Sequence, residues 1–433
     1  MRQRILFVTT GLVLGAGLGL GGCAQAPGVG DTTTPGVPAS SIASVPSPSE
    51  AGPPTSFDTD NAVEFQQGDW PGVLDGQVYY AADSTATLWA MDVTTGQSKF
   101  NVHLTSQDGG GGSNWACPAQ VVDANNIYTI VSNYSDQEVP VVVELTATDK
   151  QSGDVLWRYL PEITVPAEAT DCGVLLDYTM TPTPAGLLLT LSQWDAPHGR
   201  FNSSSAMLDA TTGDELWQTD TLVQAATGTE SGVQLSDAGV AVVDLKTGQA
   251  GPLVITTPAM DGYWKLSGYS LAGQAGDNIV VTRLDVQSHS VPQSVNLPSR
   301  LTVFQIAAGQ LASQTPLVLT TGDLGSCQVD GAILVCTGYQ DPLTASGISL
   351  ADGTSLWQTR YARSDCADAP PPLVLFGGYL YAANDDGGFV LDTSTGSAIK
   401  GAWGRPVAVS QSGMVFEADN TTAAPTFWWA AAS

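Results

Sequence analysis

Side chains that commonly perform chemistry are sparse in this 433-residue sequence, and their spacing matches no familiar catalytic or metal-binding arrangement. The glycine-rich run 108–115 (DGGGGSNW) lacks the lysine and following helix of a phosphate-binding loop, so we read it as an ordinary loop. Asp385 and Asp386 could bind a cation, but we read them as an acidic turn. The histidines do not share the short spacing of a metal site, and they are His103, His198 and His289. We predict no catalytic residue and no metal site.

The cysteine at position 23 ends a segment with the features of an export signal. Residues 1–4 carry two arginines, and residues 5–20 are apolar and rich in glycine. The sequence Leu20-Gly21-Gly22-Cys23 resembles the lipobox of bacterial lipoproteins. The resemblance implies cleavage before Cys23 and attachment of a diacylglyceryl group and a further acyl chain, such as palmitate, to that residue. Two or more chains anchor a protein stably. An uncleaved membrane-spanning segment is the alternative.

The segment after this cysteine predicts a flexible link to a folded domain. Residues 23–56 are rich in Pro, Ser, Thr, Ala and Gly and have no apolar period, so we predict a disordered tether. The chain then divides into a signal peptide (1–22), the tether (23–56) and a folded domain (57–433). A net charge of −28 repels nucleic acid and excludes it as a partner. The predicted location is the outer face of the cell membrane, or an outer membrane if the host has one.

The folded domain contains a hairpin that recurs along the chain. In SAMLDATTGDELWQTD (205–220), a short apolar run leads into a turn with an Asp and a Gly and ends on a Trp. Asp accepts hydrogen bonds from turn amides, Gly adopts a positive φ, and Trp offers a large face for packing. The frame recurs, in full or degraded form, at Gly96, Gly153, Gly213, Gly248, Gly309, Gly353 and Gly396.

A second series of hairpins lies between these copies. In each, two β-rich runs flank a tight turn, which is the pattern of two antiparallel strands. The turns lie at residues 75–76, 125–126, 185–186, 238–239, 277–278, 330–331, 377–378 and 412–413. In the fourth unit the two hairpins lie close together, so turn 238–239 is either the first or the second turn of that unit.

Two hairpins per repeated unit predict four-stranded sheets arranged as a β-propeller. The last unit has room for only three strands before Ser433, and residues 57–66 are the available fourth strand. A strand from the N-terminal side would therefore close the ring. We predict an all-β fold, a single propeller of eight blades, with seven blades as the alternative because the fourth unit is short.

The pattern Ala-x-Asp-x-x-x-Gly-x-x-x-Trp resembles the tryptophan-docking motif of pyrroloquinoline-quinone-type propeller repeats over residues 57–433. The resemblance implies that the last side chain of the motif pins neighbouring blades together. That family includes quinoprotein dehydrogenases and also cofactor-free propellers, among them outer-membrane-assembly lipoproteins. The dehydrogenases typically carry adjacent cysteines beside the cofactor, and this sequence has no Cys-Cys pair. The blade-docking candidates are Phe100, Trp157, Trp217 and, in a partial copy, Trp357.

The remaining cysteines predict disulfides, because an exported protein folds in an oxidising compartment. Cys327 and Cys336 flank the turn at 330–331 almost symmetrically, which predicts a disulfide between two adjacent strands. The other three precede the first strands of their units, which places them on one face of the ring. Cys117 and Cys172 belong to neighbouring units and form the second candidate pair. This leaves Cys366 free or paired with another molecule.

Taken together, these features predict a non-enzymatic binding or scaffold module, without a cofactor, for a protein or cell-envelope partner. The alternative is a quinoprotein-type oxidoreductase that binds pyrroloquinoline quinone with calcium. Long polar insertions in the second, third and fifth units are either a partner-binding face or tolerated surface loops. They span residues 132–140, 192–205 and 283–300.

Overall fold

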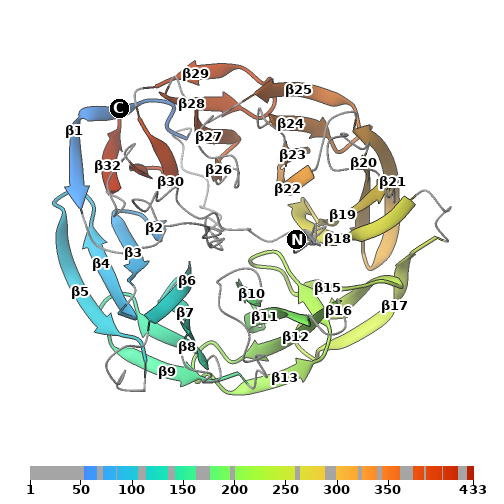
Figure 1. Cartoon of the computed structure of the whole chain (residues 1–433), viewed down its shortest axis with the longest axis horizontal. Coiled ribbons are helices and arrows are strands. Elements are labelled where there is room, and N and C mark those ends of the chain that lie inside the picture. The colour runs from blue at the N-terminus through green and yellow to red at the C-terminus, as the bar shows by residue number, and fades with distance from the viewer. Residues whose placement is uncertain are drawn as a thin grey trace, which may run out of the picture.

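Eight four-stranded antiparallel sheets stand around a central axis and form a closed ring (Figure 1). The computed structural model describes residues 53–65, 72–83, 85–105, 114–134, 142–161, 176–195, 200–258, 264–287, 299–319, 324–338, 344–360, 374–384, 387–401, 403–417 and 427–433. Within these ranges every regular element is a β-strand. The chain is therefore an all-β propeller of eight blades, which confirms the first of the two predicted blade numbers.

Each blade is built from strands that follow one another in the chain. Blades 1 to 4 contain β2 (Val73–Asp75), β3 (Val78–Ala82), β4 (Thr87–Asp92), β5 (Gln97–His103); β6 (Asn114–Val122), β7 (Asn126–Tyr134), β8 (Val142–Asp149), β9 (Val155–Tyr159); β10 (Leu176–Thr183), β11 (Gly186–Asp195), β12 (Arg200–Leu208), β13 (Glu215–Thr219); and β14 (Leu222–Gln224), β15 (Ser231–Ser236), β16 (Gly239–Asp244), β17 (Gln249–Thr256). Blades 5 to 8 contain β18 (Trp264–Ala275), β19 (Asn278–Gln287), β20 (Ser299–Ala307), β21 (Gln310–Leu319); β22 (Leu324–Asp330), β23 (Ile333–Gly338), β24 (Thr344–Ser349), β25 (Ser355–Arg360); β26 (Val374–Phe376), β27 (Tyr379–Asn384), β28 (Gly387–Asp392), β29 (Ala398–Lys400); and β30 (Arg405–Ser410), β31 (Gly413–Glu417), β32 (Phe427–Ala432) with β1 (Phe57–Phe65). The first strand of a blade lies nearest the axis and the fourth forms the rim (Figure 1).

The fourth blade resolves the ambiguity over the turn at 238–239. This turn joins β15 to β16, so it is the second turn of its blade. The first strand of the blade, β14, has only three residues and reaches β15 through residues 225–230. The equally short first strands of blades 1 and 7 are followed by tight turns, whereas this link is six residues long, so no tight-turn pattern marks the first hairpin of blade 4.

The eighth blade takes its outermost strand from the N-terminal side of the chain. Strand β1 pairs antiparallel with β32, with Phe65 opposite Phe427 and Val63 opposite Trp429. The backbone N–H of Ser433 donates to the carbonyl of Ser56 at 3.1 Å, at the point where the two ends of the described chain meet. The predicted closing strand is confirmed, and it ends at Phe65.

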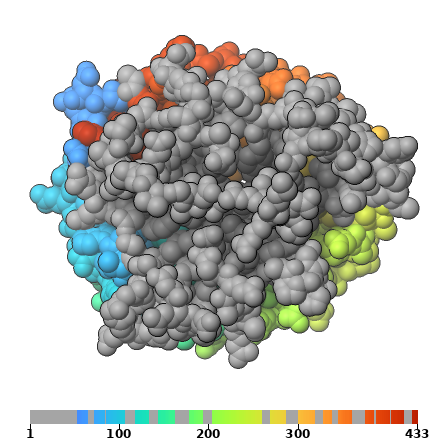
Figure 2. All heavy atoms as spheres, in the orientation of Figure 1, coloured from blue at the N-terminus to red at the C-terminus, as the bar shows by residue number. Residues whose placement is uncertain are grey.

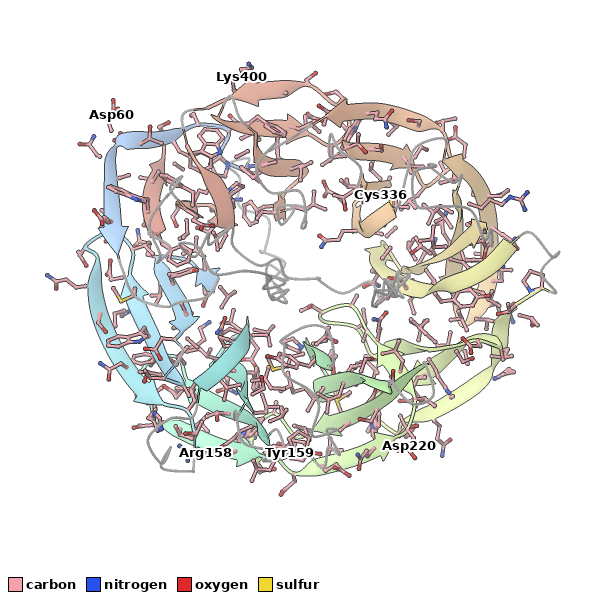
Figure 3. All side chains as sticks on the ribbon, in the orientation of Figure 1. Asp60, Arg158, Tyr159, Asp220, Cys336 and Lys400 are labelled. Atoms are coloured by element: carbon pink, nitrogen blue, oxygen red, sulfur yellow. A yellow bond between two sulfur atoms is a disulfide. The ribbon has the colours of Figure 1, made fainter. Side chains whose placement is uncertain are left out.

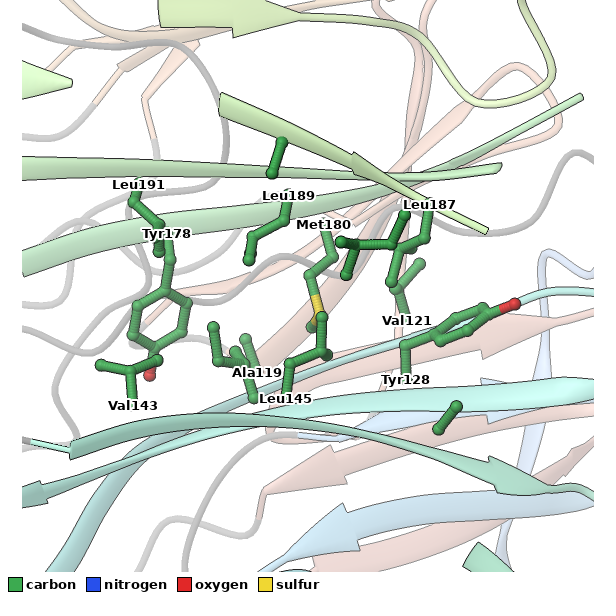
Figure 4. Close-up of a cluster of buried hydrophobic side chains, with 14 of the residues drawn as sticks. Ala119, Val121, Tyr128, Val143, Leu145, Tyr178, Met180, Leu187, Leu189 and Leu191 are labelled. Carbon is green, nitrogen blue, oxygen red and sulfur yellow. The ribbon is translucent and has the colours of Figure 1, made fainter. Parts of the chain in front are cut away.

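The core lies in the seams between blades rather than at the centre of the ring. Inner and middle strands are buried on both faces, as in β27, and therefore read as nearly continuous apolar runs. Among the described residues, each seam holds one cluster of buried apolar side chains. Figure 4 shows the cluster between blades 2 and 3, in which Tyr128 and Leu145 face Met180 and Leu187. Burial of both faces of every sheet is what stabilises the ring.

The ring has two faces that differ in how the strands are joined. Because neighbouring strands are antiparallel, first-to-second and third-to-fourth turns lie on one face, here named the turn face. Second-to-third links and the links between blades lie on the opposite face, here named the connection face. Contacts between turns of adjacent blades agree with this: Ser412 Oγ donates to Gly76 O at 2.8 Å, and Thr393 Oγ1 to Asp330 Oδ2 at 2.7 Å. In the space-filling view, the residues visible at the rim follow the order of the chain, from blue through green to red (Figure 2).

Candidate functional site

The predicted disulfide joins the first two strands of blade 6. Cys327 on β22 and Cys336 on β23 lie opposite each other and are bonded. Both are buried in the seam between blades 5 and 6, and Figure 3 shows Cys336 on the inner part of its blade. A buried disulfide is typical of a protein that folds in an oxidising compartment. The lipidation site and the other cysteines fall outside the described side chains and stay predictions: Cys23, Cys117, Cys172 and Cys366.

Trp157 shows how one blade is attached to the next. Its side chain leaves β9 and lies on Gly213, in the last turn of blade 3. A Cβ at Gly213 would lie 2.6 Å from the indole, and the residue has φ +77°, so only glycine fits there. The indole N–H donates to the carbonyl of Ala210 at 3.1 Å. Trp157 is 7% exposed and contributes to the apolar cluster between blades 2 and 3.

The same two contacts recur at two other seams. In each, an indole lies on the glycine of the next blade, and its N–H donates to the carbonyl three residues before that glycine. The donor–acceptor distances are 2.7 Å to Leu245 and 2.5 Å to Thr393. The rings and their glycines are Trp217 on Gly248 and Trp357 on Gly396.

Phe100 makes the apolar part of this contact without the hydrogen bond. Its ring lies on Gly153 of blade 2, where a Cβ would come within 2.7 Å of it. A phenyl ring has no N–H, and a different polar contact links these two blades. Lys150, in the same turn as Gly153, forms an ion pair with Asp75 of blade 1 and donates to Asp123 O at 2.8 Å. The ammonium group is largely shielded from solvent, with its side chain 16% exposed.

In the part of the chain that the structure describes, the two seams of blade 5 lack a docked aromatic ring on the last turn of the following blade. A Cβ built on Gly309 would meet no atom within 4 Å, so no side chain of blade 4 covers this turn. At the next seam, Gly353 of blade 6 is covered by the smaller side chains Thr315 and Leu317 of β21. Blade 5 is therefore joined to both its neighbours without the tryptophan contact.

Between blades 5 and 6, a glutamine makes the hydrogen bond that the indole N–H of a docking tryptophan makes at other seams. Gln305 Nε2 donates to Leu350 O at 2.7 Å, and Leu350 stands three residues before Gly353. This is the same carbonyl position that accepts the indole N–H elsewhere. Asn278 Nδ2 donates to Gln305 Oε1 at 3.2 Å and orients the amide. Sequence reasoning missed this role, although Gln305 stands where other copies of the repeat carry the turn Asp.

The seam between blades 7 and 8 is built differently because the ends of the chain meet there. Trp403 lies against Phe57, with ring centroids 5.2 Å apart at 80°. Among the described residues its indole N–H has no hydrogen-bond partner, since the third and fourth strands of blade 8 are not joined by a turn. Tyr381 of blade 7 donates instead to Pro54 O at 2.7 Å. Trp403 was not among the predicted docking residues because it follows β29, outside the repeat frame.

The aspartates of the last turns organise the backbone that receives the docking rings. In blade 3, Asp209 Oδ1 accepts from the N–H groups of Thr211 and Thr212 at 2.8 and 3.0 Å. These bonds lower the pKa of Asp209 below its usual value of 3.8. Hydrogen bonds to the carboxylate lower the pKa at the corresponding turns for the same reason, at Asp92, Asp149 and Asp392. The turns are thus held in shape by ionised side chains at neutral pH.

One buried ion pair lies in the seam between blades 4 and 5. Arg283 and Asp285 alternate along β19, with Arg283 Nη2 3.0 Å from Asp285 Oδ2. The guanidinium lies 5.6 Å from the ring centroid of Phe304, a cation–π distance. Burial raises the pKa of Asp285, and Arg283 opposes that shift. The pair occupies the part of this seam nearest the connection face and lies within its apolar packing.

Two features of the described residues concern metal binding and membrane spans. Across the ranges that the structure describes, no three His, Cys, Asp or Glu side chains lie together as a metal site would require. In the same ranges there is no apolar helix of membrane-spanning length.

The segments 132–140, 192–205 and 283–300, which the sequence leaves open as a partner-binding face or as surface loops, lie toward the connection face. They join the second and third strands of their blades, between β7 and β8, β11 and β12, and β19 and β20. The backbones of β11 and β12 continue their pairing up to Trp194 opposite Phe201 and Asp195 opposite Arg200. The structure assigns the ends of all three segments to these strands, so the links themselves are shorter than the sequence suggested. They are 135–141, 196–199 and 288–298, and they lie outside the described residues. The strand ends from which they leave lie on one face of the ring, in three separate blades.

Comparison with known proteins supports the fold and nothing finer. No protein-family model and no curated protein matches this sequence. Among solved structures, the Dos1 propeller has a TM-score of 0.50 at 9% identity and covers 88% of this chain and 95% of its own. BamB from Moraxella catarrhalis has a TM-score of 0.45 at 12% identity, covering 85% of this chain and 100% of its own.

An enzyme is also among the similar structures. A europium-containing methanol dehydrogenase has a TM-score of 0.42 at 12% identity, covering 73% of this chain and 71% of its own. Similarities this distant are shared by proteins with unrelated activities, so they carry no function to this chain. The sheet order and the docked seams of this chain themselves describe an eight-bladed β-propeller.

Proposed function

We propose that this protein is an exported lipoprotein, anchored through Cys23, whose propeller binds a protein or cell-envelope partner on its connection face and catalyses no reaction. The buried disulfide between Cys327 and Cys336 supports export. The lipobox-like sequence before Cys23 supports the anchor.

The difference between the two faces carries the proposal. On the turn face, short turns bond to one another across seams, as Ser412 does to Gly76 and Lys150 to Asp75. The connection face receives the links 135–141, 196–199 and 288–298 from three blades, on strands fixed by the seams. Loops positioned by a rigid scaffold are where propellers and similar folds carry binding sites.

Photo-crosslinking in the native envelope tests this proposal. A photoreactive residue would replace Asp220 or Asp237, which are exposed on the connection face, and in matched variants Thr211 or Lys246, exposed on the turn face. We expect one dominant crosslinked species from the connection face and little from the turn face. Equal crosslinking from both faces, or only from the turn face, would contradict the proposed surface.

The anchor and the absence of catalysis need separate measurements. Cys23→Ser should move the protein from the membrane fraction to the soluble fraction, because no lipid can then be attached. Retention of this variant in the membrane would contradict a lipid anchor. The purified protein would also be titrated with pyrroloquinoline quinone and calcium. A bound chromophore that oxidises alcohols would replace the scaffold proposal with the quinoprotein alternative.

A further inference from the structure

The path of the chain just before β1 fixes where the tether joins the ring. Pro53 lies against Gly377 in the first turn of blade 7, and a Cβ at that glycine would come within 3.0 Å of the proline ring. Tyr381 Oη donates to Pro54 O at 2.7 Å, in a buried position. Ser56 Oγ donates to Ser433 O at 2.7 Å. These contacts hold the segment 53–57 on the turn face.

The start of β1 and the residues just before it are packed against blades 7 and 8. Phe57 is 9% exposed and packs edge-on against both Trp403 and Tyr381, with centroid distances of 5.2 and 6.1 Å. Pro54 is buried as well. The described contacts of the propeller therefore include Pro53, four residues before the predicted domain boundary.

From this geometry we infer that the turn face is the membrane-proximal face of the anchored protein, and that the connection face points away from the membrane. The inference rests on the proposed lipid at Cys23. Residues 24–52 connect that cysteine to Pro53, and a flexible chain of this length has a root-mean-square span of about 30 Å. A link that short, attached to one face of a disc, favours orientations with that face toward the anchor.

Charge adds a second feature to this arrangement. The turn face carries the ionised carboxylates of Asp92, Asp149, Asp209, Asp352 and Asp392, whose pKa values are lowered by hydrogen bonds in their turns. An anionic lipid surface repels such a face across about one Debye length, roughly 10 Å at 0.1 M salt. The ring therefore stands off an anionic membrane on its tether instead of lying flat on it. The partner of the connection face is then a soluble protein, or the soluble part of an envelope protein, that approaches from the side away from the lipid.

Energy transfer to a lipid dye tests the orientation. Residues 23–433 would be joined through Cys23 to a thioester-bearing phospholipid, a ligation selective for an N-terminal cysteine, and inserted into phosphatidylcholine vesicles with a headgroup acceptor dye. A donor dye would be attached through an azide-bearing residue at Thr211 on the turn face or, as the matched control, at Asp237 on the connection face of the next blade. Both positions are exposed.

We expect about twofold or more higher transfer from position 211 than from position 237, because the tether keeps the turn face within about 30 Å of the lipid. Equal transfer, or higher transfer from 237, would overturn the inference. Vesicles containing phosphatidylglycerol should lower transfer from position 211 at low salt, and 0.5 M salt should restore it; unchanged transfer would contradict the charge effect. Since the lipid is attached chemically, the result is independent of whether the cell lipidates Cys23. Failure of the anchor proposal is seen separately in the fractionation of Cys23→Ser.

Discussion

The seams around blade 3 and those around blade 5 are built from the same repeat with different contacts. Around blade 3, Trp157 and Trp217 lie on Gly213 and Gly248 and donate to backbone carbonyls. Around blade 5, Gly309 is uncovered and the carbonyl of blade 6 is bonded by Gln305. The order of the four strands is the same in both blades, so each blade takes its place in the ring. Docking therefore sets how firmly neighbouring blades are held, while the sheet order sets the fold.

The buried disulfide lies beside one of the weakly docked seams. Cys327 and Cys336 pack in the cluster between blades 5 and 6, where Thr315 and Leu317 stand in place of a tryptophan. A cross-link stabilises mainly by restricting the unfolded chain, so it strengthens blade 6 without improving the seam itself. The seams around blade 3 and those around blade 5 should therefore differ in stability as their contacts differ.

Removal of a docking ring should have the largest effect. Trp157→Ala is expected to destabilise the protein by about 3–5 kcal/mol, because it empties a buried seam and leaves Ala210 O without its donor. Denaturant unfolding measures the loss. The matched control is Leu156→Ala, which removes a neighbouring side chain that is 46% exposed and should change stability by less than about 0.5 kcal/mol. Similar losses for the two variants would contradict a docking role for Trp157.

Two glycine substitutions separate docking from backbone strain. Gly213 and Gly309 both have positive φ, +77° and +74°, so alanine strains the backbone at either site. Only at Gly213 does the added methyl group also meet a ring. Gly213→Ala should therefore cost about 1–3 kcal/mol more than Gly309→Ala, the usual range for overpacking. Equal midpoints in urea for the two variants would show that the ring does not press on this turn.

Loss of the disulfide should have an intermediate effect. For a loop with a sequence separation of 9, the chain-entropy relation gives about 2–3 kcal/mol for Cys327→Ala combined with Cys336→Ala. Thermal unfolding of this double variant and of the reduced parent protein should shift by similar amounts. A shift only on reduction would mean that another disulfide accounts for the redox sensitivity.

The glutamine that replaces a docking ring should matter less than the ring. Gln305→Met keeps the side-chain length but removes the bond to Leu350 O, with an expected cost of about 1–2 kcal/mol. Gln314→Met, at an exposed position on the adjacent strand, is the control and should be close to neutral. If both changes are neutral, the carbonyl of Leu350 is satisfied in another way and Gln305 does not link the two blades.

The turn aspartates predict a small dependence on acid. Because the folded pKa of Asp209 lies below its usual value of 3.8, its stabilisation is present above that value and is lost as pH falls through the folded pKa. Asp209→Asn cannot titrate, so its stability should fall less than that of the parent protein between pH 5 and 2. Parallel pH profiles would contradict this role. Asp285 has the opposite sign, since burial raises its pKa and its penalty grows as pH rises.

Sequence reasoning reached the contacts that lie within one repeat and missed those that cross between dissimilar repeats. The eight blades, the closing strand and the Cys327–Cys336 bond follow from turn chemistry and local spacing. The role of Gln305 depends on Leu350, 45 residues away, and on the register of two blades. Trp403 contacts Phe57, and Tyr381 contacts Pro54, only because the ring is closed. No local sequence pattern predicts such pairs, because the partner residue resembles the other residues of its own strand.

Native-state hydrogen exchange of the turn amides tests the central claim most directly, namely that tryptophan docking makes some seams firmer than others. Docked rings lie against Gly213, Gly248 and Gly396, and no described side chain lies within 4 Å of a Cβ built on Gly309. We predict slow exchange at the first three, close to the global unfolding rate, and exchange at Gly309 through a smaller local opening. Equal protection at all four glycines, or greater protection at Gly309, would contradict the account.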